Sequence, residues 1–315
     1  MKLAGALSIM PGVFLPVSSH LTQASRDPIE RHVRVGDVDL CYFEWGVADP
    51  AESTVVLAHA TGFHARCWDR VVAALPETRH VIALDQRGHG RSAKVPPFNW
   101  ESFGRDLAGF VRAMNLERIV GVGHSMGGHA VVQAAARETA RFDRLLLVDP
   151  VIMDPDLYAS LKGTLGTQQP KDHPTSKRNN LWQSWREMFD RLSGRGSFAV
   201  WRSDVLEDYC RYGVLPNPDG AGWVLACPPL VEAAIYTGSG GRDIHDLFAT
   251  IGVPATVLRG EKRTRLEAMD FLASPTWERL ADQFPKGRDV YLPHLTHFIP
   301  MQDPELVAGF IEARD

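Results

Sequence analysis

The sequence is poor in the residues that build metal centres and disulfide frameworks. Its 315 residues include four cysteines, at positions 41, 67, 210 and 227, and none of them belongs to a Cys-x-x-Cys pair. Such wide spacing predicts reduced, mostly buried thiols. The histidines between positions 59 and 129 lack the His-x-x-x-His and His-Glu-x-x-His spacings of helical zinc sites. We therefore predict no metal and no cofactor.

The chain also lacks a surplus of positive charge and a long apolar run. Its formal net charge is −4, and no stripe of lysine and arginine is interleaved with aromatic residues, which argues against a nucleic-acid partner. No stretch reaches the roughly 20 apolar residues of a membrane span. Met1-Lys2 and the apolar run 3–17 are similar to a signal peptide, although two prolines interrupt the run. We predict a cytoplasmic protein, or an exported one if residues 1–25 act as a signal peptide.

Short apolar runs alternate with helical patterns along most of the chain. Residues 32–35 and 38–43 flank the turn Gly36-Asp37 and predict an antiparallel hairpin. Further buried strands are predicted at 54–57, 81–84, 119–122, 145–148, 254–258 and 289–292. Apolar residues at three- and four-residue steps predict helices between these runs. The pattern predicts an α/β fold with a mostly parallel central sheet and helices on both faces.

A long segment between the runs ending at 148 and starting at 254 breaks this alternation. It predicts an inserted, mainly helical cap, with helices over 182–192 and 203–212 and a third that Pro228-Pro229 opens and that runs to Tyr236. The expected organisation is an extension at 1–30, a core from 31–149 and 253–315, and a cap or lid at 150–252. Among the tryptophans of this segment, Trp182 and Trp185 are candidates for the wall of a substrate pocket, although burial against the sheet domain is favoured for any single one of them.

The pentapeptide Gly123-His124-Ser125-Met126-Gly127 is the most informative motif. It follows the apolar run 119–122 and precedes a helical stretch of small residues. A serine at such a sharp turn between a strand and a helix is typical of a nucleophile elbow, where the flanking glycines let the two elements approach. Ser125 is therefore the candidate nucleophile.

A second loop of small residues follows the run 54–57. It carries His59, Thr61 and Phe63, and it lies where a backbone N–H must meet an oxyanion. We predict that the N–H groups of Thr61 and Met126 form an oxyanion hole. His59, Phe63 and His124 are expected to line the pocket beside them.

Two further segments are expected to supply the general base and a structural loop. His297 follows the last predicted strand and stands before a helix that Asp303 caps, which favours it as the general base over His294. Asp85 to Ser92 reads as a structural loop in which Asp85 and Arg87 satisfy each other and nearby backbone groups.

These motifs and their order resemble an α/β-hydrolase with a cap domain, of the serine-nucleophile esterase and C–C hydrolase type. The resemblance covers residues 31 to 313 and rests on His59-Ala60, Asp85 to Ser92, Gly123 to Gly127 and Thr296-His297-Phe298. Together these motifs are highly specific for the fold but poorly specific for the substrate. The chain departs from the family at Ala60, where a glycine is usual.

The triad acid is the second departure. Most members place an aspartate after the seventh strand, whereas this chain reads Arg259-Gly260-Glu261-Lys262 there. Asp149, at the end of the run 145–148, is our first choice because a strand end holds a side chain rigidly. Glu261 is the alternate acid, although the basic neighbour Lys262 favours an exposed, ion-paired role for it.

The resemblance implies a serine hydrolase that cleaves an ester or lactone of a small, largely apolar substrate through an acyl-enzyme. Cleavage of a C–C bond beside a ketone is the enzymatic alternative. A non-catalytic homologue that binds a small ligand is the alternative from another class. We expect a small-molecule substrate and a monomer or homodimer.

Overall fold

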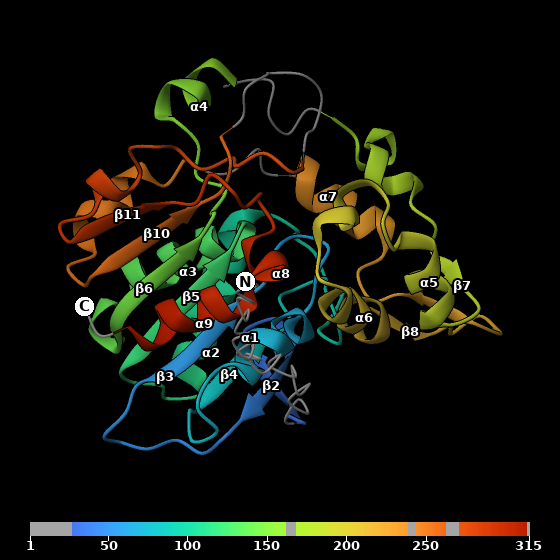
Figure 1. The fold of residues 1–315 in the computed structure, drawn as a ribbon, viewed down its shortest axis with the longest axis horizontal. Coiled ribbons are helices and arrows are strands. Elements are labelled where there is room, and N and C mark those ends of the chain that lie inside the picture. The colour runs from blue at the N-terminus through green and yellow to red at the C-terminus, as the bar shows by residue number, and fades with distance from the viewer. Residues whose placement is uncertain (1–26, 162–167, 239–242, 263–270, 314–315) are drawn as a thin grey trace, which may run out of the picture.

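An eight-stranded sheet with strand order β1-β2-β4-β3-β5-β6-β10-β11 forms the centre of the molecule (Figure 1). The computed structural model describes residues 27–161, 168–238, 243–262 and 271–313; the predicted signal-like segment 1–25 lies outside them. The strands of this sheet are β1 Ile29–Val35, β2 Val38–Trp45, β3 Thr54–Ala58, β4 Val81–Leu84, β5 Ile119–His124, β6 Phe142–Val148, β10 Ala255–Arg259 and β11 Gly287–Tyr291.

The sheet is antiparallel at one edge and parallel elsewhere. β1 pairs with β2 and β2 with β4 in antiparallel register, and every other neighbouring pair is parallel. The hairpin closes at the pair Val35↔Val38, where Gly36 has a φ of 56°. Glycine adopts this left-handed conformation without the clash that a Cβ would cause. The predicted α/β fold with a mostly parallel sheet is confirmed.

Helices cover both faces of the sheet because its side chains alternate between two apolar layers. Val56 and Ala58 of β3 pack with α2 and α3, while Val55 and Leu57 pack in a second cluster with α1 and α9. The helices are α1 Asp69–Ala73, α2 Trp100–Ala113, α3 Met126–Arg137, α4 Pro155–Leu161, α5 Trp185–Leu192, α6 Ser203–Tyr212, α7 Pro229–Thr237, α8 Ile299–Gln302 and α9 Pro304–Glu312.

The inserted segment between β6 and β10 differs from a simple helical cap in two respects. It contains a small antiparallel sheet of order β7-β9-β8, formed by Leu181–Trp182, Trp223–Leu225 and Val214–Pro216. Its two ends also pack with the core of the large sheet, through Ile152 and Phe248. Figure 1 shows α5, α6 and α7 grouped to the right of the large sheet. The predicted extent of the cap, 150–252, stays a prediction.

The structure also bears on two compositional expectations. All four cysteines are buried and free, as the spacing predicts. Within the described residues, no helix combines the length and the hydropathy that crossing a bilayer requires.

Candidate active site

Ser125 occupies a strained turn between β5 and α3. Its φ of 58° and ψ of −121° lie outside the regions that side-chain-bearing residues prefer. The turn is tight because glycines flank it: a Cβ on Gly127 would lie 2.1 Å from the carbonyl oxygen of Ala58, and one on Gly123 would lie 2.4 Å from that of Gly127. The predicted elbow geometry is present, and it carries Ser125 beyond the carboxyl end of β5.

A relay of two hydrogen bonds connects Ser125 to a buried carboxylate. The Nε2 atom of His297 lies 3.0 Å from Ser125 Oγ, and its Nδ1 atom lies 2.6 Å from Asp149 Oδ2. His297 stands on the loop between β11 and α8, and Asp149 directly follows β6. The backbone of His297 is held on both sides as well, since its N–H donates to Leu272 O at 2.7 Å and its carbonyl accepts from His124 Nε2 at 2.8 Å.

The other oxygen of Asp149 is anchored by donors from the segment after β10. Oδ1 accepts hydrogen bonds from the Gly260 N–H at 2.9 Å and from Ser274 Oγ at 2.6 Å. The aspartate itself adopts a φ of 45° and is fully buried. A carboxylate with this many donors stays oriented toward the imidazole.

The alternate acid, Glu261, lies away from this relay. Its side chain is exposed, while its backbone N–H donates to Leu295 O and its carbonyl accepts from Ser274 N–H. Among the contacts of the described residues, the carboxylate that reaches His297 is that of Asp149. The structure therefore brings together Ser125, His297 and Asp149 and leaves Glu261 outside.

The two residues predicted to supply the oxyanion hole are neighbours. Met126 opens α3, so its N–H has no partner within the helix. Thr61 lies in the loop after β3 and donates from Oγ1 to Met126 Sδ at 3.3 Å. Both backbone segments thus border Ser125 at the carboxyl end of the sheet, where negative charge is best stabilised by the start of a helix.

Two buried histidines hold the loop that carries Thr61. The Nε2 atom of His59 accepts from Gln86 N–H, and the Nε2 atom of His89 accepts from Gly62 N–H, each at 3.0 Å. Burial lowers the pKa of both imidazoles, which keeps them neutral and able to accept. Their rings stack edge to face with centroids 4.9 Å apart. These two hydrogen bonds therefore hold the loop of Thr61 in place.

Ser125 and His297 open into a cavity of about 300 Å³. Seven aromatic side chains from the sheet domain and the inserted segment line it: Phe63, Phe198, Trp201, Tyr209, Tyr236, Phe271 and Phe298. A concave, largely apolar site of this size with a few polar groups is typical of sites for small molecules.

Sequence comparison places the chain in a family. A sequence model described as "Alpha/beta hydrolase family" matches residues 55–310, which span the large sheet and the inserted segment. The chain belongs to the alpha/beta hydrolase family.

Several curated members of the family are similar to this hydrolase. It is 25% identical over 279 residues to lipase LipV of Mycobacterium tuberculosis, covering 88% of this chain and 98% of that protein. It is 32% identical to esterase YbfF of Escherichia coli over 80 residues, or 25% of this chain and 32% of YbfF. It is 35% identical to the putative carbamate hydrolase RutD of Yersinia enterocolitica over 111 residues, or 34% of this chain and 40% of RutD.

Solved structures share the fold of this hydrolase. An E-2-(acetamidomethylene)succinate hydrolase aligns with a TM-score of 0.68 at 22% identity and covers 90% of this chain and 97% of that one. An enol-lactonase from Burkholderia xenovorans aligns with a TM-score of 0.62 at 19% identity, over 89% of this chain and 98% of that one. At sequence identities this low, the similarity shows a shared fold alone.

The structure corrects most of the residues predicted to line the pocket of this hydrolase. Phe63 lines the cavity. His59 and His124 do not belong to its walls, and their side chains form hydrogen bonds with backbone groups instead. Trp182 and Trp185 pack within the apolar core of the inserted segment instead. Large aromatic side chains bury much area in such a cluster, which accounts for these two tryptophans without a substrate.

Three polar wall residues of the hydrolase carry no local signal in the sequence. Arg178 donates from Nη1 to Glu232 Oε2 and from Nη2 to the hydroxyl of Tyr209, the latter at 2.9 Å. Arg178 directly follows a short 3₁₀ helix at Pro174–Lys177, Glu232 lies on α7, and Tyr209 lies on α6. The three residues meet only in the folded chain, so none of them could be predicted from a local sequence pattern.

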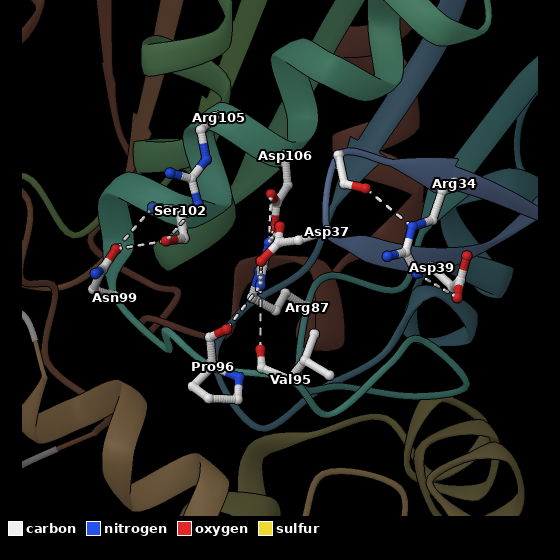
Figure 2. Close-up of polar contacts among 11 residues, drawn as sticks. Arg34, Asp37, Asp39, Arg87, Val95, Pro96, Asn99, Ser102, Arg105 and Asp106 are labelled. Atoms are coloured by element: carbon white, nitrogen blue, oxygen red, sulfur yellow. Dashed lines mark hydrogen bonds and ion pairs between the residues drawn. The ribbon is translucent and has the colours of Figure 1, made fainter.

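The structural loop of the hydrolase, Asp85 to Ser92, is held differently from the prediction. Asp85 accepts from the backbone N–H groups of Ala65 and Arg91, both at 2.7 Å. Arg87 instead lies between Asp37 of the hairpin turn and Asp106 of α2 and donates to both carboxylates (Figure 2). The expected pairing of Asp85 with Arg87 is therefore wrong, because a fully buried guanidinium finds two carboxylates elsewhere.

Proposed function

We propose that this alpha/beta hydrolase is a serine hydrolase that cleaves an ester or lactone of a small, largely apolar substrate through an acyl-enzyme. The observation that carries the proposal is the relay from Ser125 Oγ to His297 at 3.0 Å and on to Asp149 at 2.6 Å. These distances are within reach of proton transfer. The names of the curated lipase and esterase relatives support carboxylic ester hydrolysis.

In the proposed reaction, His297 accepts the proton of Ser125 as the hydroxyl oxygen attacks the carbonyl carbon. The N–H groups of Thr61 and Met126 stabilise the resulting oxyanion. Asp149 keeps the proton of His297 on Nδ1 and balances the positive charge that forms on the ring. His297 then protonates the leaving alcohol, and water releases the acyl group by the same steps in reverse.

The inserted segment would act as the lid that selects the substrate. Trp201, Tyr209 and Tyr236 come from this segment and line the cavity together with Ser125. A cavity of about 300 Å³ with aromatic walls favours a short or medium acyl group over a long lipid chain. We propose small aryl esters and lactones as the first substrates to assay.

A fluorophosphonate probe followed by mass spectrometry tests the proposal directly. We expect the probe on Ser125, loss of labelling and of p-nitrophenyl butyrate hydrolysis in Ser125→Ala, and retention of both in Ser160→Ala, an exposed serine of α4. Folded protein that is not labelled and hydrolyses no ester or lactone would contradict the proposal. Turnover confined to substrates with a C–C bond beside a ketone would favour the alternative reaction.

A further inference from the structure

The active-site cavity has a polar end that the proposed chemistry does not use. Arg178, Tyr209 and Glu232 all line the cavity that contains Ser125. Glu232 is 4% exposed, so its carboxylate is almost completely withdrawn from solvent. Arg178 is half-buried, and withdrawing such charged groups from water is costly unless their hydrogen-bonding groups are used.

The three side chains form one connected group. Arg178 bridges Glu232 Oε2 and the Tyr209 hydroxyl, and the latter bond is 2.9 Å long. Each bond uses one guanidinium N–H, and a guanidinium has further N–H donors in the same plane. The hydroxyl of Tyr209 accepts from Arg178, which leaves its own hydrogen as a donor. These three residues of the cavity wall therefore have more hydrogen-bond donors than the bonds among them use.

The carboxylate of Glu232 also borders the loop that carries Thr61. A Cβ placed on Gly62 would lie 2.7 Å from Glu232 Oε1. The second carboxylate oxygen is thus close to the loop that contributes to the proposed oxyanion hole. Burial raises the pKa of Glu232, and the neighbouring Arg178 opposes that rise. An acceptor and several donors stand side by side at this end of the cavity.

The charges of this group balance, and the balance determines what it can bind. A substrate carboxylate would meet Glu232 as well as Arg178, and a substrate ammonium would meet Arg178 as well as Glu232. Neither ion gains a net counter-charge for the water that it gives up. A neutral group that both accepts and donates hydrogen bonds satisfies Arg178 and Glu232 without adding charge.

We propose that Arg178, Glu232 and Tyr209 recognise a neutral donor–acceptor group on the substrate, such as a carboxamide or a hydroxyl. This inference rests on the proposed serine hydrolase activity and narrows its substrate class. The preferred substrates are esters or lactones with an apolar body and one such group. The three residues determine specificity and take no part in the transfer of the acyl group.

Three p-nitrophenyl esters of equal size test the proposal: the half-amide of adipic acid, the half-acid and an isosteric branched alkyl ester. We expect kcat/KM for the carboxamide to exceed that for the carboxylate and for the alkyl ester by about ten-fold or more, the range of a hydrogen bond to a charged group. In Glu232→Gln the site becomes positively charged, so the carboxamide-to-carboxylate ratio should fall below one, a drop larger than the wild-type preference of about ten-fold or more.

Two further variants separate recognition from folding. Tyr209→Phe keeps the ring but removes the hydroxyl, and we expect it to lower the carboxamide-to-alkyl ratio. Glu305→Gln is the matched control, because Glu305 also pairs with an arginine, Arg202, but is 60% exposed on α9; it should leave both ratios unchanged. Fluorophosphonate labelling of Ser125 verifies that each variant has an assembled site.

The failures of the two proposals are distinct. If the alkyl ester is hydrolysed with dependence on Ser125 while the wild type prefers the carboxylate or shows no preference, the recognition proposal is overturned and the hydrolase proposal stands. An unchanged ratio in labelled Glu232→Gln overturns it as well. If none of the three esters is hydrolysed and Ser125 is not labelled, both proposals are overturned.

Discussion

Replacement of Asp149 by asparagine should disable the proposed base without disturbing the fold. Asp149 Oδ1 accepts from Gly260 N–H at 2.9 Å and from Ser274 Oγ at 2.6 Å. In Asp149→Asn the amide oxygen must take this position, because the amide nitrogen there would face the N–H of Gly260. The NH₂ group is therefore turned toward His297 Nδ1.

An NH₂ group at that position selects the wrong tautomer of His297. The imidazole must then accept at Nδ1 and carry its hydrogen on Nε2, which is 3.0 Å from Ser125 Oγ. An Nε2–H cannot remove the serine proton. The same substitution in serine proteases lowers kcat about 10⁴-fold, equivalent to about 5 kcal/mol of activation free energy. We expect a loss of this order.

Steady-state hydrolysis of p-nitrophenyl butyrate measures kcat, and thermal unfolding verifies that the variant is folded. Glu261→Gln is the matched control, since Glu261 was the alternate acid and is exposed; we expect its kcat within about two-fold of wild type. A kcat of Asp149→Asn within ten-fold of wild type, or a larger loss in Glu261→Gln, would refute the assignment of the acid.

Three further predictions concern the framework of the site. Gly127→Ala places a Cβ 2.1 Å from the carbonyl oxygen of Ala58, and we expect a loss of about 1–3 kcal/mol in the free energy of unfolding in urea; an unchanged midpoint would contradict the close approach. Arg87→Met leaves the buried carboxylate of Asp106 without its partner, so the same assay should show a loss of about 3–5 kcal/mol, and a neutral effect would be contrary evidence. The hydrogen bond from Arg87 lowers the pKa of Asp37 to about 2 from the ordinary 3.8. The stabilisation that Asp37 provides is therefore present above pH 3.8 and is lost as the pH falls toward 2; the stability difference between wild type and Asp37→Asn should shrink across this window, and a difference independent of pH would argue against the ion pair.

The large sheet could be predicted from the sequence because its strands are short buried runs separated by helices and turns. The bounds of α6 were predicted as well, since Gly213 ends an amphipathic stretch that begins at Ser203. The small sheet β7-β9-β8 was missed. Its strands have two or three residues, too few for a period of two to appear.

The residues of the relay were accessible to sequence reasoning to different degrees. Ser125 and His297 stand in local motifs, so their order along the chain was enough to nominate them. The choice between Asp149 and Glu261 depended on which strand end faces the imidazole, a fact of three-dimensional space. The wall residues Arg178 and Glu232 come from separate elements whose contact no local pattern encodes.

The placement of the acid has a consequence for how this chain can diversify. Asp149 follows β6, which is the direct neighbour of β5, and the backbone N–H of Ser125 donates to Val148 O at 3.1 Å. Two adjoining strands therefore hold the charged partner and the nucleophile in a fixed frame. The segment after β10 supports this frame: Gly260 and Ser274 donate to the carboxylate, and Leu272 O accepts from His297 N–H. Sequence changes after β10 that keep the hydrogen bonds of Gly260, Leu272 and Ser274 would therefore leave the nucleophile, the base and the acid in register.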